Sequence, residues 1–297
     1  MRFLADEITE RLFNHFDKDI GPLPFADVLL EYAKRVAPEC QDTEIADDVL
    51  EPKQKDRYMS ALLGKQKQAI QEGRFCPYDF APDGSIIGYC FPRRRDSALM
   101  AMRRRVAPYI PPALAVLRRL NPDQFEKFGR RLLHLLKAEE AHVTSHSRDE
   151  GVDFFGWLSI PETLIMAADL PTFRSEFRVF VIGQAKRYDQ STPIGPEYVR
   201  ELVGATALFR HDQLSPWQSR YQVPSIRLMS PILPLIITTG KVSTEAKNLA
   251  QKSGVVTKDG AQLVEFLCLE GVGLSDNGAG VVSFSETDFL AWLDDEH

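Results

Sequence analysis

The chain has 297 residues and a formal net charge of −6, with 44% apolar and 26% charged residues. This composition is ordinary for a folded globular protein and excludes a chain dominated by disorder. The length exceeds the usual size of one domain, so we expect two domains.

No leader, membrane span or disulfide framework is expected. Charges interrupt the first residues, MRFLADEITERLF, which therefore lack the unbroken apolar stretch of a signal peptide. The longest apolar run, near residues 232–237, is shorter than the roughly 18 residues that a membrane helix needs. The four cysteines form no C-x-x-C pair, which argues against a structural zinc site and a secreted disulfide framework. We therefore expect a cytoplasmic protein with reduced thiols and no membrane partner.

The first part of the chain is predicted to be mainly helical. Apolar residues recur at helical spacing over residues 5–16 and again over 25–36. A third helix is expected over 55–71, because Gly73 follows as a helix stop. A polar, acidic loop is expected over 37–51.

Residues 73–92 predict a β-hairpin, because two β-prone runs, RFCPYDF and SIIGYCF, flank a Pro-Asp-Gly turn. Helices followed by a hairpin are the order of elements in a winged helix, and a small α+β packing module has the same order. A helix over 97–105 and prolines at 108, 111 and 112 then mark a joint. We expect a recognition or partner-binding domain over 1–112 and a second domain over 113–297.

From Asn121 the pattern changes to alternating helices and strands. Asn121-Pro122 predicts a helix start, with Asn as the N-cap and Pro at the first helical position. Strands are expected over 152–160, 177–186, 233–239 and 254–257, and helices over 197–209, from Ser243 and over 260–269. This order predicts an α/β fold with a mixed central sheet flanked by helices.

Two strand ends in this half carry polar residues suited to metal-assisted chemistry. Asp153 begins one apolar run, and Gln184 and Lys186 end another. Residues two apart on a strand point to the same side, so Gln184 and Lys186 can face one cleft, which Asp153 joins if the strands pair. A carboxylate and an amide or backbone carbonyl are hard oxygen ligands of the kind that Mg²⁺ accepts. A lysine beside them can stabilise the charge that develops on a phosphate under attack.

These residues lie in segments that resemble the Mrr-like restriction endonucleases of the PD-(D/E)XK nuclease superfamily. The resemblance covers about residues 121–269, half of the chain. It rests on six segments in order: FEKFGRRLLHLL, the stretch ending in GVD, QAKRY, VREL-x-GA, IITT, and TEAKNLA through VEFL. An acid followed by Q-x-K alone would be weak evidence, but with these ordered flanking segments it becomes strong.

The resemblance implies a restriction-endonuclease-like core and a role for each site residue. Asp153 would be the metal-binding acid, the carbonyl of Ala185 a further metal ligand, and Lys186 the catalytic lysine. Gln184 stands where other branches carry Asp or Glu, and Glu126 would be the acid of the entry helix that faces the site. The implied cofactor is Mg²⁺, with Mn²⁺ as a substitute.

Each of these residues also has an ordinary structural interpretation. Lys186 and Gln184 could be polar residues at a strand end, and Asp153 could cap the turn after Gly151. A glutamate such as Glu126 is favourable near a helix start because of the helix dipole.

Two departures from the family pattern concern the neighbourhood of Asp153. The separation of Asp153 from Gln184 is longer than usual, which implies an insertion within about residues 161–176. Glu150 occupies a position where glycine is more usual, and its role is not assigned.

The implied function is Mg²⁺-dependent hydrolysis of DNA phosphodiester bonds in prokaryotic, antiviral defence, as a restriction enzyme or as the effector of a larger system. The alternatives are a structure-selective nuclease for repair or junctions, and a catalytically silent DNA-binding module. A silent module would not require acid, amide and lysine together. Cutting a duplex takes two strand cuts, so we expect a homodimer or a larger symmetric assembly. A partner protein of a defence system is a further candidate.

Six arginines crowd one short stretch despite the acidic net charge: Arg93, Arg94, Arg95, Arg103, Arg104 and Arg105. One interpretation is contact with DNA phosphates, which gives affinity without sequence information. The other is a solvated helix face.

Overall fold

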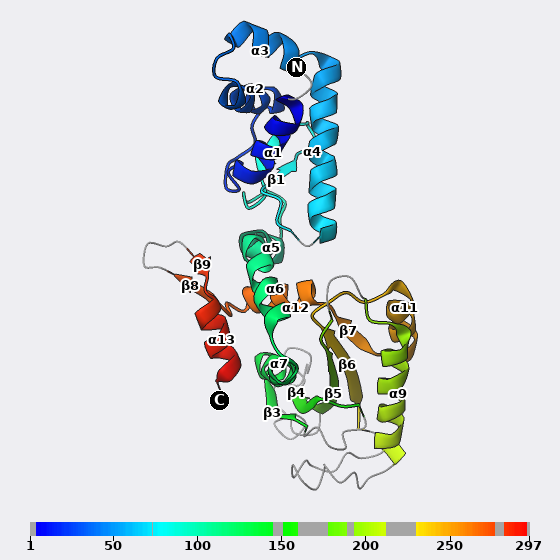
Figure 1. The fold of residues 1–297 in the computed structure, drawn as a ribbon. Coiled ribbons are helices and arrows are strands. Elements are labelled where there is room, and N and C mark those ends of the chain that lie inside the picture. Colours follow the sequence, from blue (N-terminus) through cyan, green and yellow to red (C-terminus); the bar gives the residue numbers. More distant parts are fainter. Residues whose placement is uncertain are drawn as a thin grey trace. The chain divides into compact units, whose positions relative to one another are not determined.

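The computed structural model describes residues 4–72, 74–144, 151–159, 178–188, 193–211, 230–276 and 282–295. The chain forms two compact units, Met1–Pro111 and Pro112–His297, which are described separately (Figure 1). Within the described ranges, no helix combines the length and the apolar character needed to cross a bilayer. Glu150 and the expected insertion over 161–176 lie outside these ranges.

The N-terminal unit is mainly helical, as expected. Its first helices are α1 (Leu4–His15), α2 (Phe25–Val36), α3 (Asp42–Val49) and α4 (Pro52–Glu72). Their apolar faces meet in one core that includes Leu12, Leu29 and Leu62, each fully buried. The bounds of α2 match the sequence prediction because its apolar residues recur at regular helical spacing.

Helix α3 corrects the acidic loop expected over residues 37–51. Ile45 and Val49 are one helical turn apart and both are buried in the core of this unit. The segment therefore folds as a helix because packing buries these two side chains, although most of its other residues are polar.

The hairpin is present as strands β1 (Tyr78–Phe80) and β2 (Ile86–Gly88), which pair antiparallel. Gly84 in the turn has a φ of 80°, a left-handed conformation that favours glycine. Tyr78 and Ile86 are buried in the core of the unit, so the hairpin packs on the helices of its own unit. The winged-helix interpretation stays a prediction.

The expected joint is helical. After α5 (Ala98–Val106) come the short helix η1 (Ala107–Tyr109) and α6 (Ile110–Arg119). Pro108 lies at the start of η1 and the other two prolines lie in the first turn of α6, where a missing backbone N–H costs nothing. The boundary between the units falls between those two prolines, within α6.

The second unit is built on a mixed five-stranded sheet in the order β3-β4-β5-β6-β7. Its strands are β3 (Ala138–Val143), β4 (Phe154–Ser159), β5 (Arg178–Lys186), β6 (Ile232–Thr238) and β7 (Val256–Lys258). The first three pair antiparallel and the last three parallel. Strand β3 was not expected, because its sequence AEEAHV has little apolar character and forms a strand through its pairing with β4.

Helices cover both faces of this sheet, as predicted. They are α7 (Pro122–Leu135), α9 (Pro196–His211), α11 (Thr244–Ser253) and α12 (Gly260–Leu269). Figure 1 shows α9 and α11 on one side of the sheet and α7 on the other. The final part of the chain adds the strand pair β8 (Leu274–Asp276) and β9 (Val282–Phe284) and the helix α13 (Glu286–Asp294).

Alternate residues of β5 face these two helical layers. Phe180 and Ile182 belong to the apolar cluster that α9 and α11 cover. Gly183 lies on the opposite face, against the ring of Phe154. Gly129 of α7 lies against the same ring. The sheet face on which a β5 side chain lies is therefore fixed by its parity along the strand.

Candidate active site

Asp153 lies where β4 begins and is bonded to both neighbouring strands. Its backbone N–H donates to the carbonyl of Gly183 at 2.8 Å, and its carbonyl accepts from the N–H of Thr144 at 3.0 Å. Its carboxylate Oδ2 accepts from the backbone N–H of Ala185 at 2.7 Å. The carboxylate is thus held at the carboxyl end of β5, next to the two other residues that the sequence singled out.

Gln184 and Lys186 flank Ala185 and lie on the sheet face that α9 covers, the face of Phe180 and Ile182. Gln184 is completely buried. Neither its amide nitrogen nor its amide oxygen has a hydrogen-bond partner within the described part of the chain. Leaving a buried polar atom unpaired costs about 1–3 kcal/mol. An unpaired buried amide needs an explanation, and serving a ligand is one candidate.

Lys186 is half-buried, and its ammonium lies above an aromatic ring. Its Nζ is 5.2 Å from the centre of the ring of Tyr198, which belongs to α9. An aromatic face attracts a cation, so this contact stabilises the ammonium where it lies. The ring therefore gives Lys186 a defined position at the end of β5.

Tyr198 is itself held by a hydrogen bond to a second tyrosine. Its hydroxyl is hydrogen-bonded to that of Tyr188, and this contact is the main cause that raises the pKa of Tyr198 to about 12. The backbone N–H of Tyr188 donates to Thr239 Oγ1 at 3.0 Å, and that hydroxyl donates to the carbonyl of Tyr188 at 2.9 Å. The hydrogen bonds that hold Tyr198 beneath Lys186 thus link α9 to the segment after β6.

Glu201 is a further acidic residue at this place, and the sequence analysis did not identify it. Gly151 has a φ of 82°, and a Cβ built on it would lie 2.8 Å from Oε1 of Glu201 and 3.4 Å from Nε2 of Gln184. Glu201 is exposed and lies on α9 three residues after Tyr198, so both side chains are on one side of the helix.

Glu126 lies on α7, the helix on the opposite face of the sheet from the side chains of Gln184 and Lys186. It is half-buried and lies beyond the first turn, whose acidic residue is Asp123. The helix dipole acts mainly within the first turn, so it explains Glu126 less well than it explains Asp123. A role of Glu126 in the site stays a prediction.

The donor set fits a small divalent cation. The carboxylate of Asp153 and the buried, unpaired amide of Gln184 are hard oxygen donors at one end of the sheet. No group of three or more His, Cys, Asp or Glu side chains that could hold a metal occurs among the described residues. A cation here would therefore depend on few protein ligands and on water, as is common for Mg²⁺.

The six arginines do not form one uniform set. Arg93 makes an ion pair with Asp79 at 2.6 Å. Arg104 is 8% exposed, makes an ion pair with Asp96 at 2.9 Å and donates to the carbonyl of Tyr89 at 3.2 Å. These two arginines are therefore held by contacts within the N-terminal unit, and phosphate contact by the cluster stays a prediction. The exposed members are Arg94, Arg95, Arg103 and Arg105.

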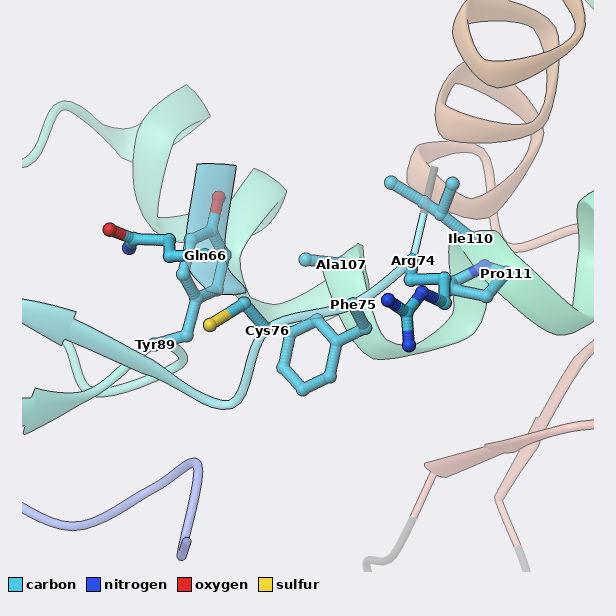
Figure 2. A pocket seen from close by; sticks show the side chains of 8 residues that line it. All are labelled: Gln66, Arg74, Phe75, Cys76, Tyr89, Ala107, Ile110 and Pro111. Atoms are coloured by element: carbon cyan, nitrogen blue, oxygen red, sulfur yellow. The ribbon is translucent and has the colours of Figure 1, made fainter. Parts of the chain in front are cut away.

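A pocket of about 180 Å³ lies within the N-terminal unit, but its chemistry does not suit hydrolysis. Figure 2 shows Phe75 in the middle of the lining, with Cys76 and Tyr89 on one side and Arg74 on the other. Burial raises the pKa of the Cys76 thiol to about 11, so it is protonated at neutral pH. The residues that line this pocket include no carboxylate and no histidine.

The sequence of the second unit matches a known family. Residues 117–214 match the family model Mrr_cat, described as restriction endonuclease. This range contains Glu126, Asp153, Gln184 and Lys186, and it confirms the resemblance to the Mrr-like family. No curated protein matches the chain.

Three solved structures are similar to parts of the chain. The MspJI restriction endonuclease in complex with a 27-mer oligonucleotide has 18% identity and a TM-score of 0.39, covering 71% of this chain and 41% of that one. The DNA modification-dependent restriction endonuclease AspBHI has 19% identity and a TM-score of 0.39, with 72% and 46% covered. The restriction endonuclease FokI bound to DNA has 10% identity and a TM-score of 0.35, with 91% and 45% covered. This chain spans less than half of the length of each.

Proposed function

From the restriction endonuclease domain at residues 117–214, we propose that this protein is a Mg²⁺-dependent endonuclease that hydrolyses DNA phosphodiester bonds. The observation that carries the proposal is the amide of Gln184, which is buried and unpaired within the described residues. It lies at the end of β5, next to Ala185, whose N–H holds the Asp153 carboxylate, and two residues before Lys186. A purely structural strand end would not keep such an amide.

Each residue has a defined task in this proposal. The N–H of Ala185 keeps the Asp153 carboxylate directed at the end of β5. Asp153 and Gln184 would hold Mg²⁺, joined by the Ala185 carbonyl, and the cation would supply charge neutralisation at the phosphate. Lys186 places a positive charge where negative charge grows on the phosphate oxygens. In the reaction, a water oxygen bonds to phosphorus, one ester bond breaks, and the leaving oxygen takes up a proton.

The proposed biological role is defence against foreign DNA in a prokaryote. The N-terminal unit would select the DNA, and its exposed arginines Arg94, Arg95, Arg103 and Arg105 would contact phosphates. A homodimer would cut both strands. Repair or junction cleavage by the same site is the second candidate, and the family match supports it equally because both are endonucleolytic.

The test is cleavage of methylated plasmid, unmethylated plasmid and a branched DNA duplex by the full chain. Each substrate is incubated with Mg²⁺, with Mn²⁺, and with excess chelator. We expect cleavage with either metal and none with chelator. Cleavage of a plasmid supports the defence role, and cleavage confined to branched DNA supports the repair role. Cleavage at full rate in chelator contradicts the metal dependence, and DNA binding without cleavage of any substrate supports the silent module.

A further inference from the structure

We propose that Glu201 is a second carboxylate of the divalent-cation site, acting with Asp153 and Gln184. This inference rests on the proposed endonuclease function and adds a ligand from α9, an element outside the two strands that carry the other residues. The ligand it assigns to Glu201 is a hard divalent cation such as Mg²⁺ or Mn²⁺.

The position of Glu201 follows from the glycine two residues before Asp153. A Cβ on Gly151 would be 2.8 Å from Oε1 of Glu201, closer than real Cβ contacts, and 3.4 Å from Nε2 of Gln184. One carboxylate and one amide therefore lie against the same glycine, whose φ of 82° already disfavours any side chain there. This close approach brings Glu201 to the place where the Asp153 strand begins.

The state of Gln184 indicates that something binds at this place. Gln184 is 0% exposed, and both atoms of its amide are unpaired within the described residues. The Nε2 end of the amide lies beside Gly151, where Oε1 of Glu201 also lies. A buried polar group gains most when a ligand satisfies it, because its interaction with water has already been lost.

Charge gives the reason for a second acid. Gln184 is neutral, so Asp153 alone would leave a doubly charged cation with a single negative protein ligand. Mg²⁺ sites commonly use one or two carboxylates and complete the shell with water and phosphate oxygens. Glu201 supplies the second carboxylate, and because it is exposed it is accessible to a cation from solvent.

The structural alternatives account for Glu201 less well. It is well beyond the first turn of α9, whose acidic residue is Glu197, so the helix dipole gives it little stabilisation. Glu201 is also on the side of α9 that carries Tyr198, the ring beneath Lys186. One side of the helix thus presents both the support for the lysine and the proposed carboxylate.

The test measures cation binding by the full chain without DNA. Isothermal titration with Mn²⁺ and with Mg²⁺ is carried out on the wild type, Glu201→Gln and Asp153→Ala. The matched control is Glu197→Gln, which makes the same change on the same helix at an exposed residue turned toward Gly195. We expect Glu201→Gln to raise the Kd for the cation about tenfold or more, the scale of losing a supporting group at a metal site. We expect Glu197→Gln to leave the Kd unchanged.

The outcomes separate this inference from the proposed function. If the wild type binds the cation, Asp153→Ala does not, and Glu201→Gln binds as the wild type does, the inference is wrong while the function stands. If the wild type neither binds a cation nor cuts DNA, both fail. Glu201→Asp keeps the charge and should bind more tightly than Glu201→Gln at equal thermal stability. Equal affinities of these two variants would overturn the role of the charge.

Discussion

Gln184 offers a test in which stability and activity should move in opposite directions. Gln184→Met keeps an unbranched side chain of similar size and removes both polar atoms of the amide. The wild type leaves two buried atoms unpaired among the described residues, at about 1–3 kcal/mol each. We therefore expect Gln184→Met to raise the free energy of unfolding of the metal-free protein by about 1–3 kcal/mol, because part of the gain is lost to imperfect packing.

Activity should respond in the opposite sense. The same variant lacks the amide that we propose to serve the cation, so DNA cleavage in Mg²⁺ should fall by roughly a hundredfold or more. A gain of stability with a loss of function is typical of a residue kept for chemistry.

The comparison variant is Gln184→Glu, which keeps a ligand oxygen and adds a charge. Without metal, an unpaired carboxylate at this buried position should lower the free energy of unfolding. Added Mg²⁺ should restore it, by an amount that grows with the ratio of cation concentration to Kd. The two variants should therefore differ in the sign of their metal-free stability change.

The assay is urea unfolding in chelator and in Mg²⁺, followed by fluorescence, with the transition of each unit analysed separately. Plasmid cleavage is measured on the same samples. If Gln184→Met were less stable than the wild type by more than 1 kcal/mol and still cut DNA, the amide would be an ordinary packing group. Gln184 would then have no place in a cation site.

Three further predictions concern the neighbours of Gln184 and the arginines. Lys186→Ala should lower the cleavage rate about a hundredfold or more, with DNA affinity and thermal stability nearly unchanged; cleavage at the wild-type rate would contradict its role. Tyr198→Phe should keep the cleavage rate, because the ring remains beneath the ammonium of Lys186. Tyr198→Leu removes the ring and should lower kcat about two- to thirtyfold, the range expected for losing a cation–π contact, with KM little changed. Equal rates for the two Tyr198 variants would show that the ring does not position the lysine. Replacing the exposed Arg94 and Arg95 with Ala should weaken binding to all DNA sequences alike and reduce the slope of log affinity against log salt by about one unit per lost contact. The ion-paired Arg93 serves as the control, since Arg93→Ala should act mainly on thermal stability.

Several features could be predicted from the sequence because their causes are local. The capping box of α7 depends on four consecutive residues. The side chains of Asn121 and Gln124 each accept a hydrogen bond from the backbone N–H of the other. The hairpin over β1 and β2 follows from a Pro-Asp-Gly turn between two β-prone runs. The shared side of Gln184 and Lys186 follows from the two-residue period of a strand. The sequence alone therefore predicted the layered α/β core, which the structure confirms, and proposed the three residues at its strand ends.

Other features were decided by tertiary packing, because they depend on residues far apart in the chain. Helix α3 forms because Ile45 and Val49 are buried in the core of the N-terminal unit, and β3 forms because it pairs with β4. The same applies to charged residues. In the sequence nothing distinguishes Arg104 from the other arginines of its cluster, but in the structure it is ion-paired with Asp96 and donates a hydrogen bond to the carbonyl of Tyr89.

The candidate site shows this division most clearly. The sequence predicted Asp153, Gln184 and Lys186 from their places at the ends of apolar runs and from the resemblance to the Mrr-like family. It could not identify Glu201, because only the packing of α9 on the sheet brings that carboxylate against Gly151, fifty residues earlier in the chain. Nor could it show that the amide of Gln184 is buried without a partner in the described residues, since burial is a property of the assembled sheet and its helices. The local sequence pattern predicted which residues are candidates for the site, and the packing of distant segments decided which of those side chains lie close together.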